Sequence, residues 1–148
     1  MAKALLLTPY EEERIFAGMY AGKRARLCLA VNGGSLSLSS TTAQWDAAEI
    51  SGNGYARYQW TIPSGSYNST TGRFEAPAQL CEFLASANGQ GLTWNTVYVV
   101  LGTIANSTTT WFTGVSMVLA ESPNISVVAG QPKSYNLKIV ANGLEVTS

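Results

Sequence analysis

The spacing of apolar residues changes along the chain, from a helical period near the start to an alternating period afterwards. Between Pro9 and Ala21 the apolar side chains recur at the spacing of one helix face. That face is formed by Ile15, Phe16, Met19 and Tyr20. Thr8 is placed to cap the helix, and Glu11 completes the Thr-x-x-Glu pattern of a capping box. Gly22 suits the helix end, so the pattern predicts a helix over residues 9–21.

After Gly22 the apolar positions alternate, as they do in β-strands. The expected strands are 25–31, a weak one at 36–38, 55–62, 73–76, 94–102, 111–120, 125–128, 135–139 and 144–147. Gly, Pro or Asn bounds nearly all of them, and Asn142-Gly143 is a strong hairpin signal. About eight or nine short strands predict an antiparallel, jelly-roll-like β-sandwich. We expect one domain over residues 1–148, with an arm at 1–9, the helix at 9–21 and the sandwich at 25–148.

Aromatic and apolar residues concentrate in a few of these strands. The run Val97–Leu101 is apolar on both faces, which suits a sandwich interior or an oligomer interface. Trp60, Trp94 and Trp111 lie in or beside predicted strands, where packing in the core or at an interface is the default. The alternative is a carbohydrate-binding platform, which would need several of the rings exposed together on one face.

The composition narrows the classes of partner. Hydrophobic residues make up 46% of the chain and charged residues only 12%, with a formal net charge of zero. No basic stripe interleaves with aromatic residues, and no apolar run approaches the length of a membrane span. We therefore expect neither nucleic acid nor a membrane as a partner, and a cytoplasm-like compartment before assembly. Cys28 and Cys81 lack CxxC spacing and are expected to be buried free thiols.

The residues that carry most enzyme chemistry are sparse. The chain has no histidine, the commonest general base and metal ligand. Asp46 and Glu49 are close enough in sequence to share a cation, although two solvated carboxylates near a turn is the simpler interpretation. A glycosidase pair could be drawn from Glu49, Glu75 or Glu82, but their spacing selects none. We expect no enzyme activity and no catalytic, cofactor-binding or metal-ligating residues.

One motif suggests a family. The run EISGNGYARYQW, from Glu49 to Trp60, resembles the E-[IV]-[ST]-G-x-G-Y-A-R signature of small bacteriophage virion proteins, which include tail-fibre-like and head-decoration jelly-roll proteins. The order of helix, strand, signature and final hairpin is similar over almost the whole chain. The chain departs from the family in having Trp94-Asn95 where Trp-Gly is common, and in a longer segment from Gln79 to Leu92.

The resemblance implies a virion structural protein, assembled in the host cytoplasm. The leading hypothesis is a capsid decoration or cement protein, a homo-oligomer and most plausibly a homotrimer, that clamps the major capsid protein or other virion proteins. The alternatives are a tail baseplate or fibre-adaptor component, and a receptor- or glycan-binding module. The arm and helix are a natural docking element. The candidate interface residues are Phe16, Tyr20, Tyr55, Arg57 and Trp111. For Arg57 two roles stay open: a solvent-facing strand residue, or the donor of an ion pair between subunits.

Overall fold

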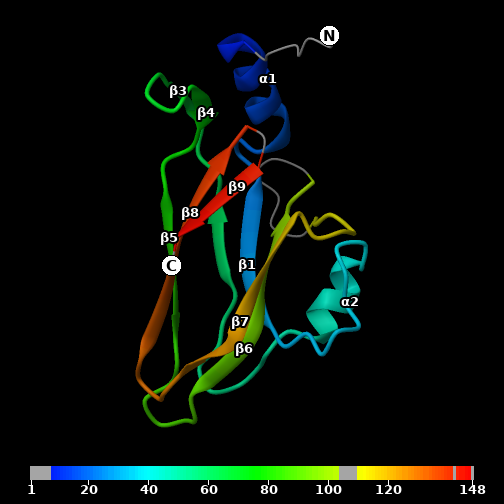
Figure 1. Ribbon diagram of the computed structural model, residues 1–148, viewed down its shortest axis with the longest axis vertical. Coiled ribbons are helices and arrows are strands. Elements are labelled where there is room, and N and C mark those ends of the chain that lie inside the picture. The colour runs from blue at the N-terminus through cyan, green and yellow to red at the C-terminus, as the bar shows by residue number, and fades with distance from the viewer. Residues whose placement is uncertain (1–7, 104–109, 142, 148) are drawn as a thin grey trace.

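Two antiparallel β-sheets packed face to face make up the body of the molecule, with one helix at an end and a second at a side (Figure 1). This computed structural model describes residues 8–103, 110–141 and 143–147. Most of the expected arm at 1–9, and Asn142 of the expected hairpin turn, lie outside these ranges. The elements in chain order are α1 (Pro9–Met19), β1 (Arg24–Ala30), α2 (Thr42–Ala47), β2 (Tyr58–Thr61), β3 (Ser66–Asn68), β4 (Arg73–Glu75), β5 (Gln79–Leu84), β6 (Leu92–Leu101), β7 (Met117–Val127), β8 (Pro132–Val140) and β9 (Gly143–Thr147).

The strand order joins segments that are far apart in the sequence. One sheet has the order β2-β1-β6-β7, and the other has β3-β4-β8-β5, with β9 also paired to β8. The predicted sandwich and the final hairpin of β8 and β9 are confirmed. The central pairing of β1 with β6 runs from Ala25 opposite Leu101 to Ala30 opposite Thr96. The core lies between the sheets and includes Leu27, Trp94 and Leu137.

The predicted N-terminal helix is confirmed, and its local signals act much as expected. The Thr8 hydroxyl accepts a hydrogen bond from the Glu11 backbone N–H at 3.2 Å. The Glu11 carboxylate binds Arg14 instead of returning to Thr8, so only half of the predicted capping box forms. Phe16 and Tyr20 anchor the helix, because both side chains are buried in the core. Gly22 takes a positive φ of 76°, as a residue after a helix end often does.

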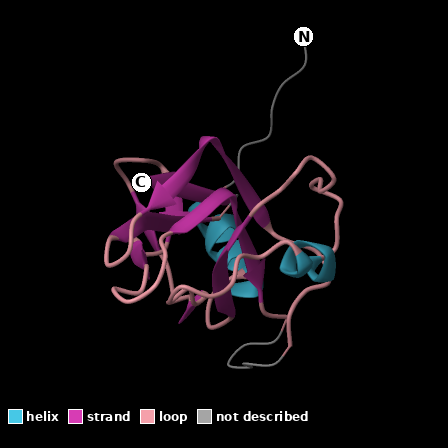
Figure 2. Cartoon of the chain, turned by 90° about the horizontal axis from the view of Figure 1, so that it is seen from below, coloured by secondary structure: helices cyan, strands magenta, loops and turns pink. Residues whose placement is uncertain are grey.

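Strand β6 is covered on both faces within this single chain. Val97, Val99 and Leu101 point into the sandwich core. Tyr98 and Val100 point the other way and belong to a second apolar cluster with Trp45 of α2. Seen from below, α2 lies beside the strands rather than between them (Figure 2). The doubly apolar pattern of β6 therefore has an intramolecular explanation, in which α2 covers the outer face of the sheet.

Several predicted boundaries are wrong. The strand expected over 55–62 covers only Tyr58–Thr61. The strand expected over 111–120 begins at Met117 and continues to Val127 as one element, with an irregular register opposite Trp94 to Thr96. Residues 36–38 form no strand. The helix α2, the strand β5 and the short strand β3 were not expected.

Cys28 and Cys81 are both free and buried, as expected. Cys28 lies in the cluster beneath α2, whereas Cys81 lies in the core between the sheets. Burial raises the pKa of each thiol from its ordinary value of 9.0 to about 12. Both side chains therefore remain neutral thiols at physiological pH.

Candidate functional site

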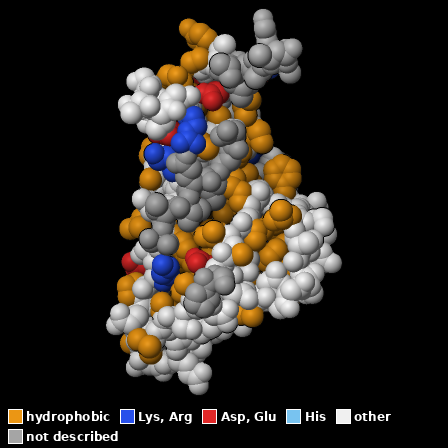
Figure 3. All heavy atoms as spheres, viewed as in Figure 1, with side chains coloured by type: hydrophobic (Ala, Val, Ile, Leu, Met, Phe, Trp, Pro, Cys, Tyr) orange, Lys and Arg blue, Asp and Glu red, His pale blue; other side chains and the backbone are white. Residues whose placement is uncertain are grey.

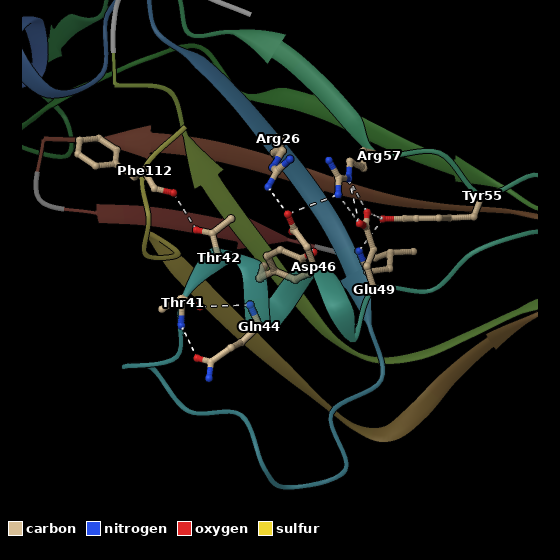
Figure 4. Close-up of polar contacts among 11 residues, drawn as sticks. Arg26, Thr41, Thr42, Gln44, Asp46, Glu49, Tyr55, Arg57 and Phe112 are labelled. Atoms are coloured by element: carbon tan, nitrogen blue, oxygen red, sulfur yellow. Dashed lines mark hydrogen bonds and ion pairs between the residues drawn. The ribbon is translucent and has the colours of Figure 1, made fainter. Parts of the chain in front are cut away.

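The residues of the sequence signature meet charged side chains from α2 and β1 at the outer face of one sheet. We call this group, consisting of Arg26, Asp46, Glu49, Tyr55, Arg57 and Tyr98, the polar cluster. Figure 4 shows Arg26, Asp46, Glu49 and Arg57 converging above β1, with Tyr55 reaching in from the side. The cluster brings together two arginines, two carboxylates and two tyrosines.

Helix α2 delivers Asp46 to the cluster, and a capping box starts this short helix. The Thr41 hydroxyl accepts from the Gln44 backbone N–H at 3.2 Å, and the Gln44 side chain accepts from the Thr41 backbone N–H at 2.8 Å. The Thr42 hydroxyl donates to the Phe112 carbonyl at 2.9 Å, which attaches the helix to the segment before β7. These bonds fix the helix so that Trp45 faces β6 while Asp46 faces β1.

The glycine-rich turn places Tyr55. Asn53 has a φ of 55° and Gly54 a φ of 85°, so the chain turns sharply before the tyrosine. A Cβ atom at Gly54 would lie 2.7 Å from the Ser86 backbone nitrogen, which requires glycine at this position. The Tyr55 ring stacks on Phe83 at 6.1 Å between centroids. Its hydroxyl accepts from the Leu29 backbone N–H at 3.0 Å and donates to Glu49 at 2.6 Å.

Arg57 is bound to carboxylates of its own chain. Its Nε lies 2.8 and 2.9 Å from the two oxygens of Glu49, and its Nη2 lies 2.7 Å from one of them. A second carboxylate, that of Asp46, lies 3.6 Å from Nη2. The hydrogen bonds to Glu49 raise the pKa of Arg57, so its charge is permanent. The sequence left Arg57 as a solvent-facing residue or an intersubunit donor; in the structure it is the donor of an intramolecular ion pair.

Asp46 completes the cluster. It accepts from Arg26 at 2.8 Å and from the Tyr98 hydroxyl at 2.8 Å. Arg26 is buried on β1, and its guanidinium also stacks over the Trp111 ring, 4.8 Å from the ring centre. Asp46 and Glu49 do share a cation, but that cation is the guanidinium of Arg57. The simpler sequence interpretation, two solvated carboxylates, is wrong because both are ion-paired.

The contacts of the polar cluster hold neighbouring structural elements together. Two arginines neutralise two carboxylates, and two tyrosine hydroxyls hold the carboxylates in place. Burial raises the pKa of Tyr55 and of Tyr98, and the hydrogen bonds to Glu49 and Asp46 raise them further. Both hydroxyls therefore stay protonated at physiological pH and act as hydrogen-bond donors. The cluster joins α2, β1, β6 and the signature into one unit.

The other candidate interface residues lie in different surroundings. Phe16 and Tyr20 are buried in the core, where Phe16 also packs on Phe74. Tyr55 and Trp111 are half-buried and contact Phe83 and Arg26 as described. Phe16 and Tyr20 thus contribute to the fold of this chain, and only Tyr55, Arg57 and Trp111 keep some exposed surface.

The tryptophans do not form the exposed platform that a carbohydrate site would need. Trp45, Trp60 and Trp94 are buried, and Trp111 is half-buried beneath Arg26. The indole of Trp94 donates to the Tyr135 hydroxyl at 3.0 Å, which links the two sheets. Core packing, the default expectation, is confirmed for Trp60 and Trp94.

The three carboxylates weighed as a glycosidase pair have no binding partner in common. Glu49 belongs to the polar cluster. Glu75 accepts from Asn68 at 2.8 Å and from Lys138 at 3.4 Å. Glu82 is exposed on β5. Over the ranges that the structure describes, no three Cys, Asp or Glu side chains gather in a way that could hold a metal ion.

Two of the open grooves among the described residues have linings that contain no member of the polar cluster. The first, of about 410 Å³, runs between the end of α1 and residues 112–117, and its apolar lining includes Met19, Phe112 and Met117. The second, of about 470 Å³, lies between the end of β5 and the turn at Gly54, and its lining is mostly Gly, Ala and Ser. Neither groove was expected from the sequence.

Comparison with family models, with curated proteins and with solved structures finds no match to this chain. None of the helices within the described ranges has the length and apolar character needed to span a membrane. Sequence reasoning missed Arg26 and Tyr98 as members of the cluster. An arginine inside the apolar strand 24–30 was the available signal, because a buried arginine requires a partner.

Proposed function

We propose that this chain is a structural module of a bacteriophage particle that acts through surface contacts, as a capsid decoration protein. The observation that supports the proposal is the set of contacts that the signature residues make within the chain. Glu49, Tyr55 and Arg57 bind one another and fasten α2 over the sheet. The motif that resembles virion proteins therefore supports a rigid fold, and the contacts with other molecules are made by the remaining surface.

That surface suits a protein that packs against others. Charged residues make up only 12% of the chain. On the face that Figure 3 shows, charged side chains are few and hydrophobic side chains gather in several patches. Large apolar side chains are exposed, with Met19 and Phe112 at one groove and Leu38, Leu84 and Val128 elsewhere. Weakly charged surface with apolar anchors is typical of stable protein interfaces.

Immunogold labelling of phage particles that carry this chain tests the proposal. Label distributed over the head is the expected result for a decoration protein. Label confined to the tail would contradict the decoration role and favour the baseplate or fibre-adaptor alternative. Particles without any label, while the protein stays in the lysate, would contradict the structural role altogether.

A second measurement separates a stabilising role from passive attachment. Heads from which the protein has been removed should release their genome at a lower temperature than complete heads. Adding back the purified chain should restore the release temperature, because bound contacts stabilise the assembled state by mass action. A release temperature that is the same with and without the protein would contradict the cement role.

A further inference from the structure

Four Asn-Gly pairs occur in the chain, and in such a pair an asparagine reacts readily with its own backbone. The glycine has no Cβ atom that would shield its nitrogen or restrict its backbone. That nitrogen can attack the amide carbon of the asparagine side chain when the two atoms come within about 3–3.5 Å in the right orientation. The structure describes both residues of the pairs that begin at Asn32, Asn53 and Asn88, whereas Asn142 lies outside the described ranges.

The side chain and the backbone of Asn32 are both held by hydrogen bonds. Its amide oxygen accepts from the Gly34 N–H at 2.9 Å and from the Leu36 N–H at 3.2 Å, and its amide nitrogen donates to the Leu36 carbonyl at 3.2 Å. Asn95 accepts from the Asn32 N–H at 2.7 Å and donates to the Asn32 carbonyl at 2.8 Å. We therefore expect the amide to turn towards the Gly33 nitrogen only after several of these bonds break.

The backbone of Asn53 is held within the signature turn. Its carbonyl accepts from the Ser86 N–H at 2.8 Å, and its amide nitrogen donates to the Gly91 carbonyl at 3.4 Å. A Cβ atom at Gly54 would lie 2.7 Å from the Ser86 nitrogen, so this glycine packs closely against Ser86. The Gly54 nitrogen therefore has little room to swing towards the side chain of Asn53.

Asn88 and Gly89 lie in an exposed turn between β5 and β6. The Gly89 N–H donates to the Ser86 carbonyl at 3.2 Å, and the Asn88 N–H donates to the Ser86 hydroxyl at 3.4 Å. Both bonds are longer than the common value of about 2.9–3.0 Å. They come from the backbone of the turn, whereas the bonds that hold Asn32 include three from its side-chain amide. The Asn88 amide can therefore reach the Gly89 nitrogen once this exposed turn opens.

We propose that Asn88-Gly89 is a self-modification site, at which the chain converts its own asparagine to aspartate and isoaspartate. The Gly89 nitrogen gives its proton to water or hydroxide and forms a bond to the amide carbon of Asn88. The bond from that carbon to Nδ2 breaks, and ammonia leaves after Nδ2 takes up a proton. Water then opens the resulting ring at either of its carbonyls, which gives aspartate or isoaspartate. No atom changes its oxidation state, and water is the only co-reactant.

The modified turn adjoins the signature turn. Either product carries a new carboxylate, so the formal net charge of the chain changes from zero to −1. A Cβ atom at Gly89 would lie 3.5 Å from the Cα atom of Asn53, which places the new charge beside the turn that positions Tyr55. Isoaspartate also lengthens the main chain by one carbon atom. This chemistry goes beyond the proposed function and does not depend on it.

Peptide mapping by mass spectrometry tests the proposal on the purified full chain, incubated at pH 8. Asn88 should convert at least about tenfold faster than Asn32, because the three bonds to the Asn32 amide add to its barrier. In guanidinium chloride the two rates should become similar, because the denatured chain keeps the sequence and loses these bonds. Anion-exchange chromatography follows the added charge independently.

An alanine after Asn88 tests the attack by the backbone nitrogen. Gly89→Ala should slow the conversion of Asn88 by at least about tenfold, because the added Cβ atom hinders the approach of that nitrogen. The nearest atoms to this Cβ would lie at 3.4 and 3.5 Å, which is ordinary contact that the fold accommodates. Gly33→Ala is the matched control, since its Cβ meets no atom within 4 Å, and it should leave the rate at Asn88 unchanged.

A third variant tests whether hydrogen bonds protect Asn32. Asn95→Ala removes the two bonds that hold the Asn32 backbone. It should speed the conversion of Asn32 by at least about threefold while the rate at Asn88 stays the same. Circular dichroism confirms the folding of each variant.

Two results would overturn the proposal. The first is a native chain in which Asn32 converts as fast as Asn88. The second is an Asn88 that stays intact in the native chain over the time in which it converts in guanidinium chloride, because the fold would then protect this turn as well. Both comparisons use the unaltered chain, so they stand even where a variant fails to fold.

Discussion

The guanidinium of Arg57 holds both carboxylate oxygens of Glu49, with three nitrogen-to-oxygen distances between 2.7 and 2.9 Å. Glu49 is nearly buried, whereas Arg57 is one-third exposed. This ion pair holds Arg57 within the polar cluster. Breaking the pair should therefore weaken the packing of α2 on the sheet. Such a bidentate pair is specific in geometry as well as in charge.

Arg57→Ala should lower the free energy of unfolding by about 1–3 kcal/mol, because it leaves the nearly buried Glu49 carboxylate without its cation. Urea denaturation at pH 7 measures the change. Arg14→Ala is the matched control, since Arg14 forms an exposed ion pair with Glu11 on α1. That control should leave the stability close to that of the original protein, because an exposed ion pair contributes little. Equal losses in the two variants would contradict the role given to the cluster.

Trp45→Ala should destabilise the protein by about 3–5 kcal/mol, because it removes the fully buried ring that fills the space between α2 and β6. Hydrogen exchange should quicken most in β1 and β6, whose outer face the helix covers. Leu38→Ala provides the comparison, as Leu38 is 79% exposed in the loop before α2. A Trp45 variant as stable as the Leu38 variant would show that the cover contributes little.

Glu75 should make the protein sensitive to acid. The hydrogen bond from Asn68 lowers the pKa of Glu75, and Lys138 and Arg73 lower it further. A carboxyl group whose pKa is lower in the folded state stabilises that state above the ordinary pKa, near 4.5, and the contribution is lost as the pH falls through the lower folded value. Glu75→Gln should therefore cost about 1 kcal/mol at pH 7 and almost nothing at pH 2.

Cys28 and Cys81 should be protected from thiol reagents in the native protein. Burial holds the pKa of both thiols at about 12, and neither sulfur is exposed. Ellman's reagent at pH 8 should react at least about 100-fold more slowly in buffer than in denaturing urea. Because the folded pKa is raised, this contribution to stability is complete below the unfolded pKa, near 9, and is lost as the pH rises towards 12. Rapid labelling of either thiol in the native state would contradict the packing described.

The elements with local signals were predictable. Helix α1 follows from its cap, its glutamates and its apolar face, all within 15 residues of sequence. Helix α2 was not predicted, because six residues are too few to show a helical period. Thr41 and Gln44 nevertheless match the capping-box pattern. Strand β5 was not predicted because the exposed leucines Leu80 and Leu84 hide the alternation of its buried residues Cys81 and Phe83.

The polar cluster was only partly predictable. Glu49, Tyr55 and Arg57 are close in sequence and stand in the recognised run, so their importance was visible. Their partners were not, because Arg26 and Tyr98 reach Asp46 only through the long-range pairing of β1 with β6. Sequence spacing also placed Arg57 on a regular strand, whereas the positive φ values at Asn53 and Gly54 turn it towards Glu49.

We propose that this chain is a structural component of a phage particle. Quantitative mass spectrometry of purified particles tests it most directly. The account predicts that the chain stays with the particles through density-gradient purification, at a copy number in fixed ratio to the major capsid protein. A chain that is abundant in the lysate but absent from the purified particles would contradict the account.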